Sequence, residues 1–217
     1  METIKQFLLK IKNWSLNYED DKGITMKKIL LALGLTLISK LAFSQAVIVQ
    51  YGVQQNQAGK QTQGHYVQLN VAMPVTENLV NDFGINAFQA DVNKSEFNRF
   101  EDGMTYKYRL NNTFTSSIRG GLGYMESSNN GNWAYYNIEP KITADLTHGF
   151  DVSLAYRWRR SFNNAYFDDS QTARYALGYH ITNKDYVRVI FDDLHGSNGN
   201  TYNNPNKTLS VAYTRNF

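Results

Sequence analysis

The feature of this sequence that most limits its possible folds is an alternation of apolar and polar residues with a period of two. The clearest example is the segment 150–159, in which every second residue is apolar or aromatic: Phe150, Val152, Leu154, Tyr156 and Trp158. The charged residues of the segment lie at the intervening positions: Asp151, Arg157 and Arg159. Because successive side chains of a β-strand point to opposite faces, the segment predicts a strand with one apolar and one charged face.

Three more segments alternate in the same way, and in each of them the charged residues share one face: 104–110, 134–146 and 173–181. Strands that are apolar on one face and polar on the other are typical of β-barrels that cross a membrane, because their outer surface contacts lipid. Pro140 interrupts one of these segments. Since proline cannot donate a backbone hydrogen bond inside a strand, we expect a β-bulge there.

The connecting segments alternate between short and long. The short ones are 74–78, 110–112, 146–149 and 182–185, and the long polar ones are 56–64, 91–98, 126–132, 161–171 and 195–206. This pattern implies ten strands, with both chain ends on the side of the short turns. We therefore predict an all-β fold, a single transmembrane antiparallel up-and-down β-barrel of ten strands. The segment 79–91 alternates least clearly, so barrels of eight or twelve strands remain alternatives.

Composition excludes several other classes of protein. The chain has 217 residues, which is enough for one domain. It is 42% hydrophobic, yet its mean hydropathy of −0.49 is too low for a helical membrane protein. Past residue 50, no apolar run approaches the roughly 20 residues that a membrane-spanning helix needs. The absence of cysteine excludes disulfides and cysteine-based metal sites, and a net charge of +3 does not indicate nucleic-acid binding.

Residues 26–46 have the layout of a secretion signal. Lys27 and Lys28 precede a short apolar stretch at 29–38, and small residues follow: Ala42, Ser44 and Ala46. This layout predicts a signal peptide that is cleaved after Ser44 or after Ala46.

The residues upstream of this signal, 1–25, are polar and of mixed charge. Translation that starts at Met26 and a long leader that is removed with the signal are two alternative explanations. We expect an upstream extension at 1–25 that is not part of the mature protein, a signal peptide at 26–46 and the barrel at 47–217.

The C-terminal run TLSVAYTRNF ends on Phe217, behind which Leu209, Val211 and Tyr213 alternate. This run resembles the closing strand of bacterial outer-membrane β-barrels, which the barrel assembly machinery recognises. Arg215 stands where that family more often has an aromatic residue. The resemblance implies a location in the outer membrane of a Gram-negative bacterium. It also implies membrane lipid and, through Phe217, the assembly machinery as partners.

The stretch from RLNNTF to AYRWRR resembles the small oligogalacturonate-specific porins in its strand–turn–strand layout. The likeness also rests on the basic residues of one strand: Arg157, Arg159 and Arg160. It covers less than half of the mature chain, and those porins usually have more strands than the ten counted here. The resemblance implies a pore that is lined by arginine and passes acidic sugar oligomers.

The polar faces of the predicted strands give the candidates that would line a lumen: Lys107, Arg109, Arg119, Glu139, Lys141, Arg157, Arg159, Arg174, Arg188 and Asp192. Further inward-facing acids are Glu101, Asp145 and Asp151. Inward charges that pair with one another would plug a small barrel. A surplus of arginines would instead line a narrow aqueous pore that favours small or anionic solutes, such as acidic oligosaccharides. The sequence leaves both interpretations open.

Enzymatic and binding functions are weaker alternatives. His195 stands two residues after Asp193 and two before Ser197, spacings that occur in barrel-embedded hydrolases. The same string is also typical of a polar loop, and we assign no catalytic residue. Long loops rich in Asn and Gly are compatible with a barrel that binds a partner at the cell surface.

Other polar and aromatic residues complete the expectations. We expect no cofactor and no metal site, and we expect His180 to face the lumen among arginines. Girdle aromatics near the outer interface are expected at four positions: Trp133, Tyr135, Tyr156 and Trp158.

Overall fold

The computed structural model describes residues 45–55, 62–91, 96–128, 131–162, 169–196 and 206–217. These residues form ten strands: β1 (Ala46–Gln55), β2 (Thr62–Pro74), β3 (Leu79–Ala90), β4 (Glu96–Arg109), β5 (Phe114–Ser127), β6 (Gly131–Asp145), β7 (Phe150–Ser161), β8 (Ser170–His180), β9 (Asp185–Gly196) and β10 (Asn206–Asn216). A single 3-10 turn, η1 (Thr147–Gly149), connects β6 to β7. Within the described part of the chain, no helix has the length and apolarity that a membrane span requires.

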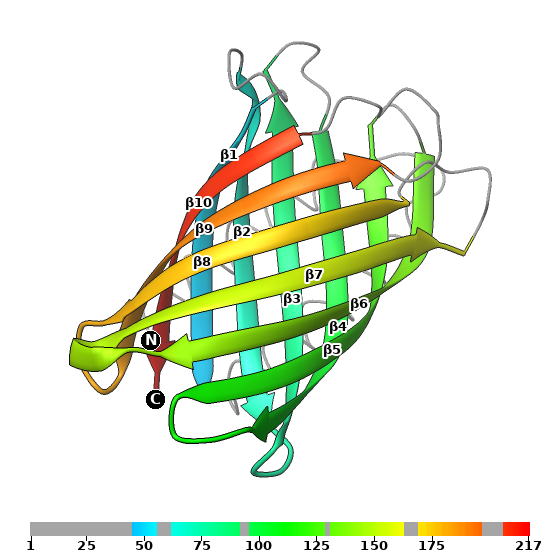
Figure 1. The fold of residues 1–217 in the computed structure, drawn as a ribbon. Helices are drawn as coiled ribbons and strands as arrows, with labels where there is room; N and C mark the ends of the chain where they lie inside the picture. Colours follow the sequence, from blue (N-terminus) through cyan, green and yellow to red (C-terminus); the bar gives the residue numbers. More distant parts are fainter. Residues whose placement is uncertain (1–44, 56–61, 92–95, 129–130, 163–168, 197–205) are drawn as a thin grey trace, which may run out of the picture. The chain divides into compact units, whose positions relative to one another are not determined.

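The ten strands form a closed antiparallel barrel in which each strand pairs with its neighbours along the chain and β1 pairs with β10 (Figure 1). The predicted all-β up-and-down barrel of ten strands is therefore confirmed. The segment that alternates least clearly forms a full strand, β3, so the alternatives of eight and twelve strands are wrong.

Short turns join β2 to β3, β4 to β5, β6 to β7 and β8 to β9, at the end of the barrel where the C terminus is marked (Figure 1). We call this the turn end, and the opposite end the loop end. Side-chain oxygens close these turns: Asn111 Oδ1 accepts from the Phe114 N–H at 2.8 Å, and Thr182 Oγ1 accepts from the Asp185 N–H at 2.9 Å. Local bonds of this kind explain why Asn and Thr mark the short connectors in the sequence. Most residues of three predicted long loops, 56–64, 161–171 and 195–206, lie outside the described ranges. The predicted loop 126–132 is shorter than expected, because β5 extends to Ser127 and β6 begins at Gly131.

The outer face of the barrel carries exposed aliphatic and aromatic side chains. Leu154, Leu177 and Val211 are each about half exposed, as a surface that contacts lipid requires. The lipid-facing alternation predicted for β10 is confirmed, since Leu209, Val211 and Tyr213 are all exposed on this face.

Two of the predicted girdle aromatics are wrongly placed. Trp133 and Tyr135 are 9% and 0% exposed and face inward, where they pair across the β5–β6 ladder with Met125 and Gly123. The apolar residues on the outer face of β6 occupy the even-numbered positions, so the odd-numbered Trp133 and Tyr135 must point inward. Tyr156 and Trp158 do lie on the outer face, with their ring centroids 4.6 Å apart.

The β-bulge expected at Pro140 is absent. The β6–β7 ladder pairs Ile138 with Trp158 and resumes with Lys141 paired to Ala155, so the two strands have equal numbers of residues between these pairs. Proline removes backbone pairing locally without inserting a residue. The register shifts instead in β1, between Gln54 and Gln55.

Barrel closure includes the residue before β1. The Gln45 N–H donates to the Ala72 carbonyl at 3.0 Å, and the Phe217 N–H donates to the Gln45 carbonyl at 2.9 Å. Ala46 pairs with both Ala72 and Asn216. Cleavage after Ala46 would remove these contacts, whereas cleavage after Ser44 would keep them.

We therefore predict that the mature chain begins at Gln45. The upstream extension and most of the signal lie outside the described residues, so this remains a prediction about processing. Intact-mass measurement of the protein extracted from membranes should give the mass of residues 45–217. A mature chain that begins at Val47 would contradict the prediction.

The register of β7 predicts effects of different size for two neighbouring substitutions. Leu154→Arg places a charge on the lipid-facing surface near the middle of the strand and should lower the free energy of unfolding by about 2–4 kcal/mol. Ser153→Arg places the same charge on the inner face and should lower the free energy of unfolding by much less. Urea unfolding in phospholipid vesicles measures both, and equal losses would show that the register is wrong.

Candidate functional site: the charged lumen

The inner face of the barrel is divided into a charged wall and an uncharged wall. Strands β3 to β9 contribute the charged inward-facing side chains: Asp82, Arg99, Glu101, Lys107, Arg109, Arg119, Glu139, Lys141, Asp145, Asp151, Arg157, Arg159, Arg174, Arg188 and Asp192. The inner faces of β10, β1 and β2 carry no charged residue over their described lengths. Amides, hydroxyls and small residues line them, together with Ile48, which packs against Ala176, Ile190 and Ala212.

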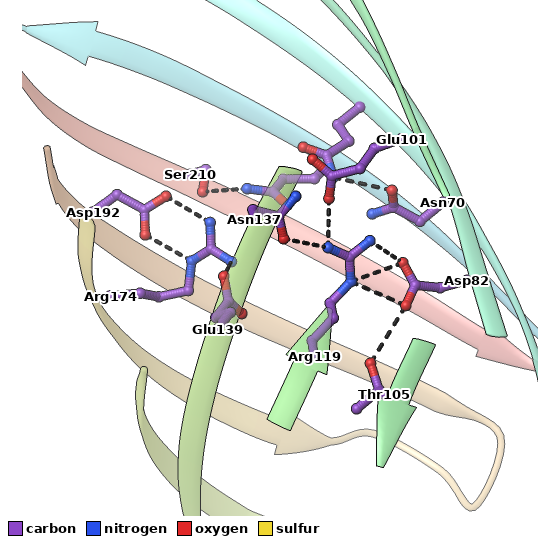
Figure 2. Close-up of polar contacts among 12 residues, drawn as sticks. Asn70, Asp82, Glu101, Thr105, Arg119, Asn137, Glu139, Arg174, Asp192 and Ser210 are labelled. Carbon is purple, nitrogen blue, oxygen red and sulfur yellow. Dashed lines mark hydrogen bonds and ion pairs between the residues drawn. The ribbon is translucent and has the colours of Figure 1, made fainter. Parts of the chain in front are cut away.

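The first charged cluster is centred on Arg119 of β5. Its Nε donates to Oδ1 and Oδ2 of Asp82 on β3 at 3.0 Å, and its Nη1 forms an ion pair with Glu101 on β4 (Figure 2). Asn137 Oδ1 accepts a further bond from Nη1 at 3.1 Å. Arg119 is thus held by two carboxylates and an amide. Tyr135 donates to the other oxygen of Glu101 at 2.8 Å.

The second cluster repeats this arrangement around Arg174 of β8. Nε and Nη2 donate to the two oxygens of Asp192 on β9 at 2.7 and 2.9 Å, and Nη1 donates to Glu139 on β6 at 3.3 Å (Figure 2). The two carboxylate side chains are 10% and 13% exposed. Bidentate pairing satisfies the fixed fork of the guanidinium and orients it.

The uncharged wall is joined by its own hydrogen bonds. Gln50 Nε2 donates to the Tyr66 hydroxyl at 2.7 Å and to Ser210 Oγ at 2.8 Å, which links β1 to both of its neighbours. Asn86 Nδ2 donates to Gln68 Oε1 at 3.3 Å and so links β3 to β2. These groups offer donors and acceptors to the lumen without a net charge.

The ion pairs of the lumen join strands that lie close to one another around the barrel wall. The ion pairs of the two clusters join β5 to β3 and β4, and β8 to β6 and β9. The remaining lumen ion pair described, between Arg188 and Asp151 at 3.7 Å, joins β9 to β7. Each of these pairs links strands no more than two positions apart in the barrel. The ion pairs therefore hold the charged groups against the wall.

Cations exceed carboxylates in this lumen. Asp82, Glu101, Glu139 and Asp192 are each bonded to Arg119 or Arg174. Two other arginines, Arg99 and Arg157, have buried Nε atoms without a hydrogen-bond partner in the described part of the chain. Arg157 is close enough to Glu139 and Asp192 for its charge to act on both. Its positive charge thus adds to a wall whose carboxylates are already paired.

The turn end of the lumen is lined by the remaining basic candidates. Arg188 Nε donates to the Tyr186 hydroxyl at 2.8 Å, and that hydroxyl donates to Asp151 Oδ2 at 2.6 Å. Lys107 is exposed and Lys141 is half-buried on the same inner face. Arg109 Nε donates to the carbonyl of Asn111 at 3.1 Å, so this guanidinium is attached to the β4–β5 turn.

The loop end of the lumen is more apolar. Met125, Trp133 and Tyr135 form a buried cluster against which Phe97 packs. The guanidinium carbon of Arg159 lies 4.9 Å from the centre of the Tyr135 ring, a cation–π contact. Arg159 is 2% exposed, so this part of the wall is closely packed.

All ten residues proposed from the sequence lie on the inner face of their strands, as the register requires. Asp82 and Arg99 were missed. Asp82 lies in the segment whose alternation is least clear, and Arg99 stands between Asn98 and Phe100 close to a long loop. Gly84 and Asn86, two and four residues after Asp82, lie on the same inner face. Small and polar residues at every second position from 82 to 86 were the signal from which the inward direction of Asp82 could have been predicted.

Arg160 does not join the basic residues of the lumen. It pairs with Tyr136 on the outer face and forms an ion pair with Asp169 at 2.7 Å. Of the three basic residues in AYRWRR, only Arg157 and Arg159 point inward.

The histidines lie at the rims of the barrel. His195 Nε2 is 3.3 Å from Asp193 Oδ1, but both side chains are on the outer face and the histidine is 54% exposed. Ser197, the nucleophile of the hydrolase alternative, lies outside the described residues. His180 is on the inner face, with its ring centroid 4.6 Å from that of Tyr186. Among the residues described, no three His, Asp or Glu side chains are grouped to hold a metal.

Comparison with known proteins finds similarity in structure alone. No protein-family model matches the chain, and no curated protein matches it. The NanC porin is similar with a TM-score of 0.52 and 11% identity, over 79% of this chain and 100% of that chain. The KdgM porin has a TM-score of 0.46 and 15% identity, over 78% of this chain and 99% of that chain. At 11% identity, the NanC porin shows a shared barrel fold.

The arginine clusters predict a large stability cost when their centre is removed. Arg174→Ala leaves Asp192 and Glu139 buried without their counter-ion and should lower the free energy of unfolding by about 3 kcal/mol. Arg109→Ala, at an exposed arginine bonded only to turn carbonyls, should change it by less than about 0.5 kcal/mol. Urea unfolding in vesicles compares the two. Similar values for both variants would contradict this assignment of the buried cluster.

Proposed function

We propose that this protein is an outer-membrane channel through which small solutes diffuse passively, with a preference for anions. The outer-membrane location is supported by the lipid-facing belt, by the terminal Phe217 and by the secretion signal in the sequence. In this proposal Phe217, which is 72% exposed, is also the residue that the barrel assembly machinery contacts.

The observation that carries the channel proposal is the direction of the lumen ion pairs. A plug is held by bonds that cross the lumen, whereas the pairs of Arg119, Arg174 and Arg188 follow the wall. Charged side chains that are fixed to the wall leave room for water and solute along the axis. A ten-stranded barrel is wider than the eight-stranded barrels whose interior is just large enough for side chains to fill.

The anion preference is supported by the surplus of positive charge. In the described part of the chain, Arg99, Arg157 and Lys141 face the lumen without an ion pair of their own. A low-dielectric passage lined by one sign of charge concentrates counter-ions of the other sign. Small carboxylates and acidic oligosaccharides are solutes of this class, and the uncharged wall of Gln50, Tyr66 and Ser210 offers partners for hydroxyl groups.

A plugged structural barrel is the second candidate. It is favoured by the packing at the loop end, where Arg159 is 2% exposed and Tyr135 is 0% exposed. In that case the clusters would act only in stability. Conductance separates the two candidates.

The test is planar-bilayer conductance of the refolded mature protein, with reversal potentials measured in a salt gradient. We expect discrete open channels that favour anions over cations. The double variant Arg157→Ser with Arg159→Ser should remove this preference, because it takes two positive charges from the inner face.

Arg160→Ser is the matched control, since it removes a neighbouring arginine of the same strand that faces outward. It should leave the reversal potential unchanged. No conductance from the parent protein would overturn the channel and favour the plug. Conductance without anion preference would overturn the proposed selectivity.

A further inference from the structure

The side chain of Arg119 reaches across a whole strand. Arg119 is on β5 and pairs directly with Thr105 of β4, yet its main partner Asp82 is on β3. The guanidinium must therefore pass over β4. The residue that Asp82 faces on β4 is Gly103, which in turn pairs with Gly121 on β5 (Figure 2 shows Arg119 and Asp82).

Gly103 provides the space for this crossing. A Cβ atom added at residue 103 would lie 2.6 Å from Cζ and 2.9 Å from Nε of Arg119, and closer still to Nη2. Carbon and nitrogen atoms that are not bonded normally stay more than 3 Å apart, so the guanidinium lies directly on the β4 backbone. A Cβ at Gly121 would be 2.9 Å from Nη1 of the same arginine and 3.0 Å from Asn137 Nδ2.

The same relation recurs elsewhere on the inner face. In each case a glycine lies beneath the large side chain of a neighbouring strand, with no room for a Cβ: Gly52 beneath Tyr66, Gly123 beneath Tyr135 and Gly178 beneath Tyr186. Gly120 differs, because it points outward and has no atom within 4 Å of a Cβ position. The close contacts are therefore a property of the inner face.

We infer that Gly103 is a positioning residue of the lumen. Because it has no side chain, the Arg119 guanidinium lies flat on the wall, where it meets both Asp82 and Glu101. A side chain at 103 displaces the far end of a flexible arginine, so the barrel still forms and the charge moves towards the axis. The predicted effect of Gly103 on solute passage rests on the proposed function, whereas its effect on the position of Arg119 does not.

The test compares Gly103→Ala with Gly120→Ala, two glycines on paired strands that flank Arg119 from opposite faces. In Gly103→Ala the reaction of Arg119 with phenylglyoxal, followed by mass spectrometry in detergent, should rise about tenfold. This is the change expected when an arginine loses a hydrogen bond to a charged group. Gly120→Ala should react like the parent protein. Unchanged reactivity of Arg119 in folded Gly103→Ala would overturn the inference.

A double-mutant cycle covers the case in which Gly103→Ala folds poorly. If residue 103 acts through Arg119, adding Gly103→Ala to Arg119→Ala should cause no further loss of folded protein. A further loss equal to that of Gly103→Ala alone would show that the glycine serves the backbone instead, and would overturn the inference.

Channel recordings then separate this inference from the proposed function. In a conducting protein, Gly103→Ala should lower single-channel conductance while Gly120→Ala leaves it unchanged. Equal conductance in Gly103→Ala, despite raised reactivity, would restrict the role of Gly103 to the ion-pair cluster and overturn its effect on passage. A parent protein that does not conduct would refute the channel alone, and the reactivity of Arg119 would still decide the role of Gly103.

Discussion

Closure of the β1–β10 ladder is the constraint on which the rest of this structure depends. In a membrane, each backbone N–H and C=O that faces lipid must find a partner within the protein, and a closed sheet leaves no edge. Here closure extends to Phe217, whose backbone N–H donates a hydrogen bond to the Gln45 carbonyl. Once the sheet is closed, the period of two decides which side chains meet lipid and which meet the lumen. Every charged group of the site is placed by that rule.

The lumen shows how a small barrel can hold many charges without unpaired carboxylates at its centre. Arg119 and Arg174 each bind two carboxylates of nearby strands, and in the first cluster the guanidinium crosses the intervening strand above a glycine. Each ion pair joins two strands, so the same contacts stabilise the barrel and keep the charged groups on the wall. In the proposed channel, the remaining arginines and lysines would determine the net field that a solute meets.

The sequence predicted the fold well because alternation and turn spacing are local signals. It placed all ten candidate side chains on the inner face, and it missed Asp82 because the alternation of β3 is weak. Trp133 and Tyr135 were assigned to the girdle by residue type, although the register of β6 puts them inside. The pairing of Arg119 with Asp82 could not be predicted, because it joins β5 to β3, which are not paired in the sheet, and depends on Gly103 of the strand between them. The resemblance to the oligogalacturonate-specific porins named Arg160 beside Arg157 and Arg159, whereas the register of β7 places Arg160 on the outer face.

We propose that water and small anions pass along a lumen whose charges are held on the wall. Osmotic swelling of liposomes that contain the refolded protein tests it most directly, with two solutes of similar size, the anion glucuronate and the neutral sugar glucose. Both solutes should enter, and glucuronate should enter faster because the surplus arginines attract it. Liposomes that swell with neither solute would contradict the claim and indicate a sealed barrel.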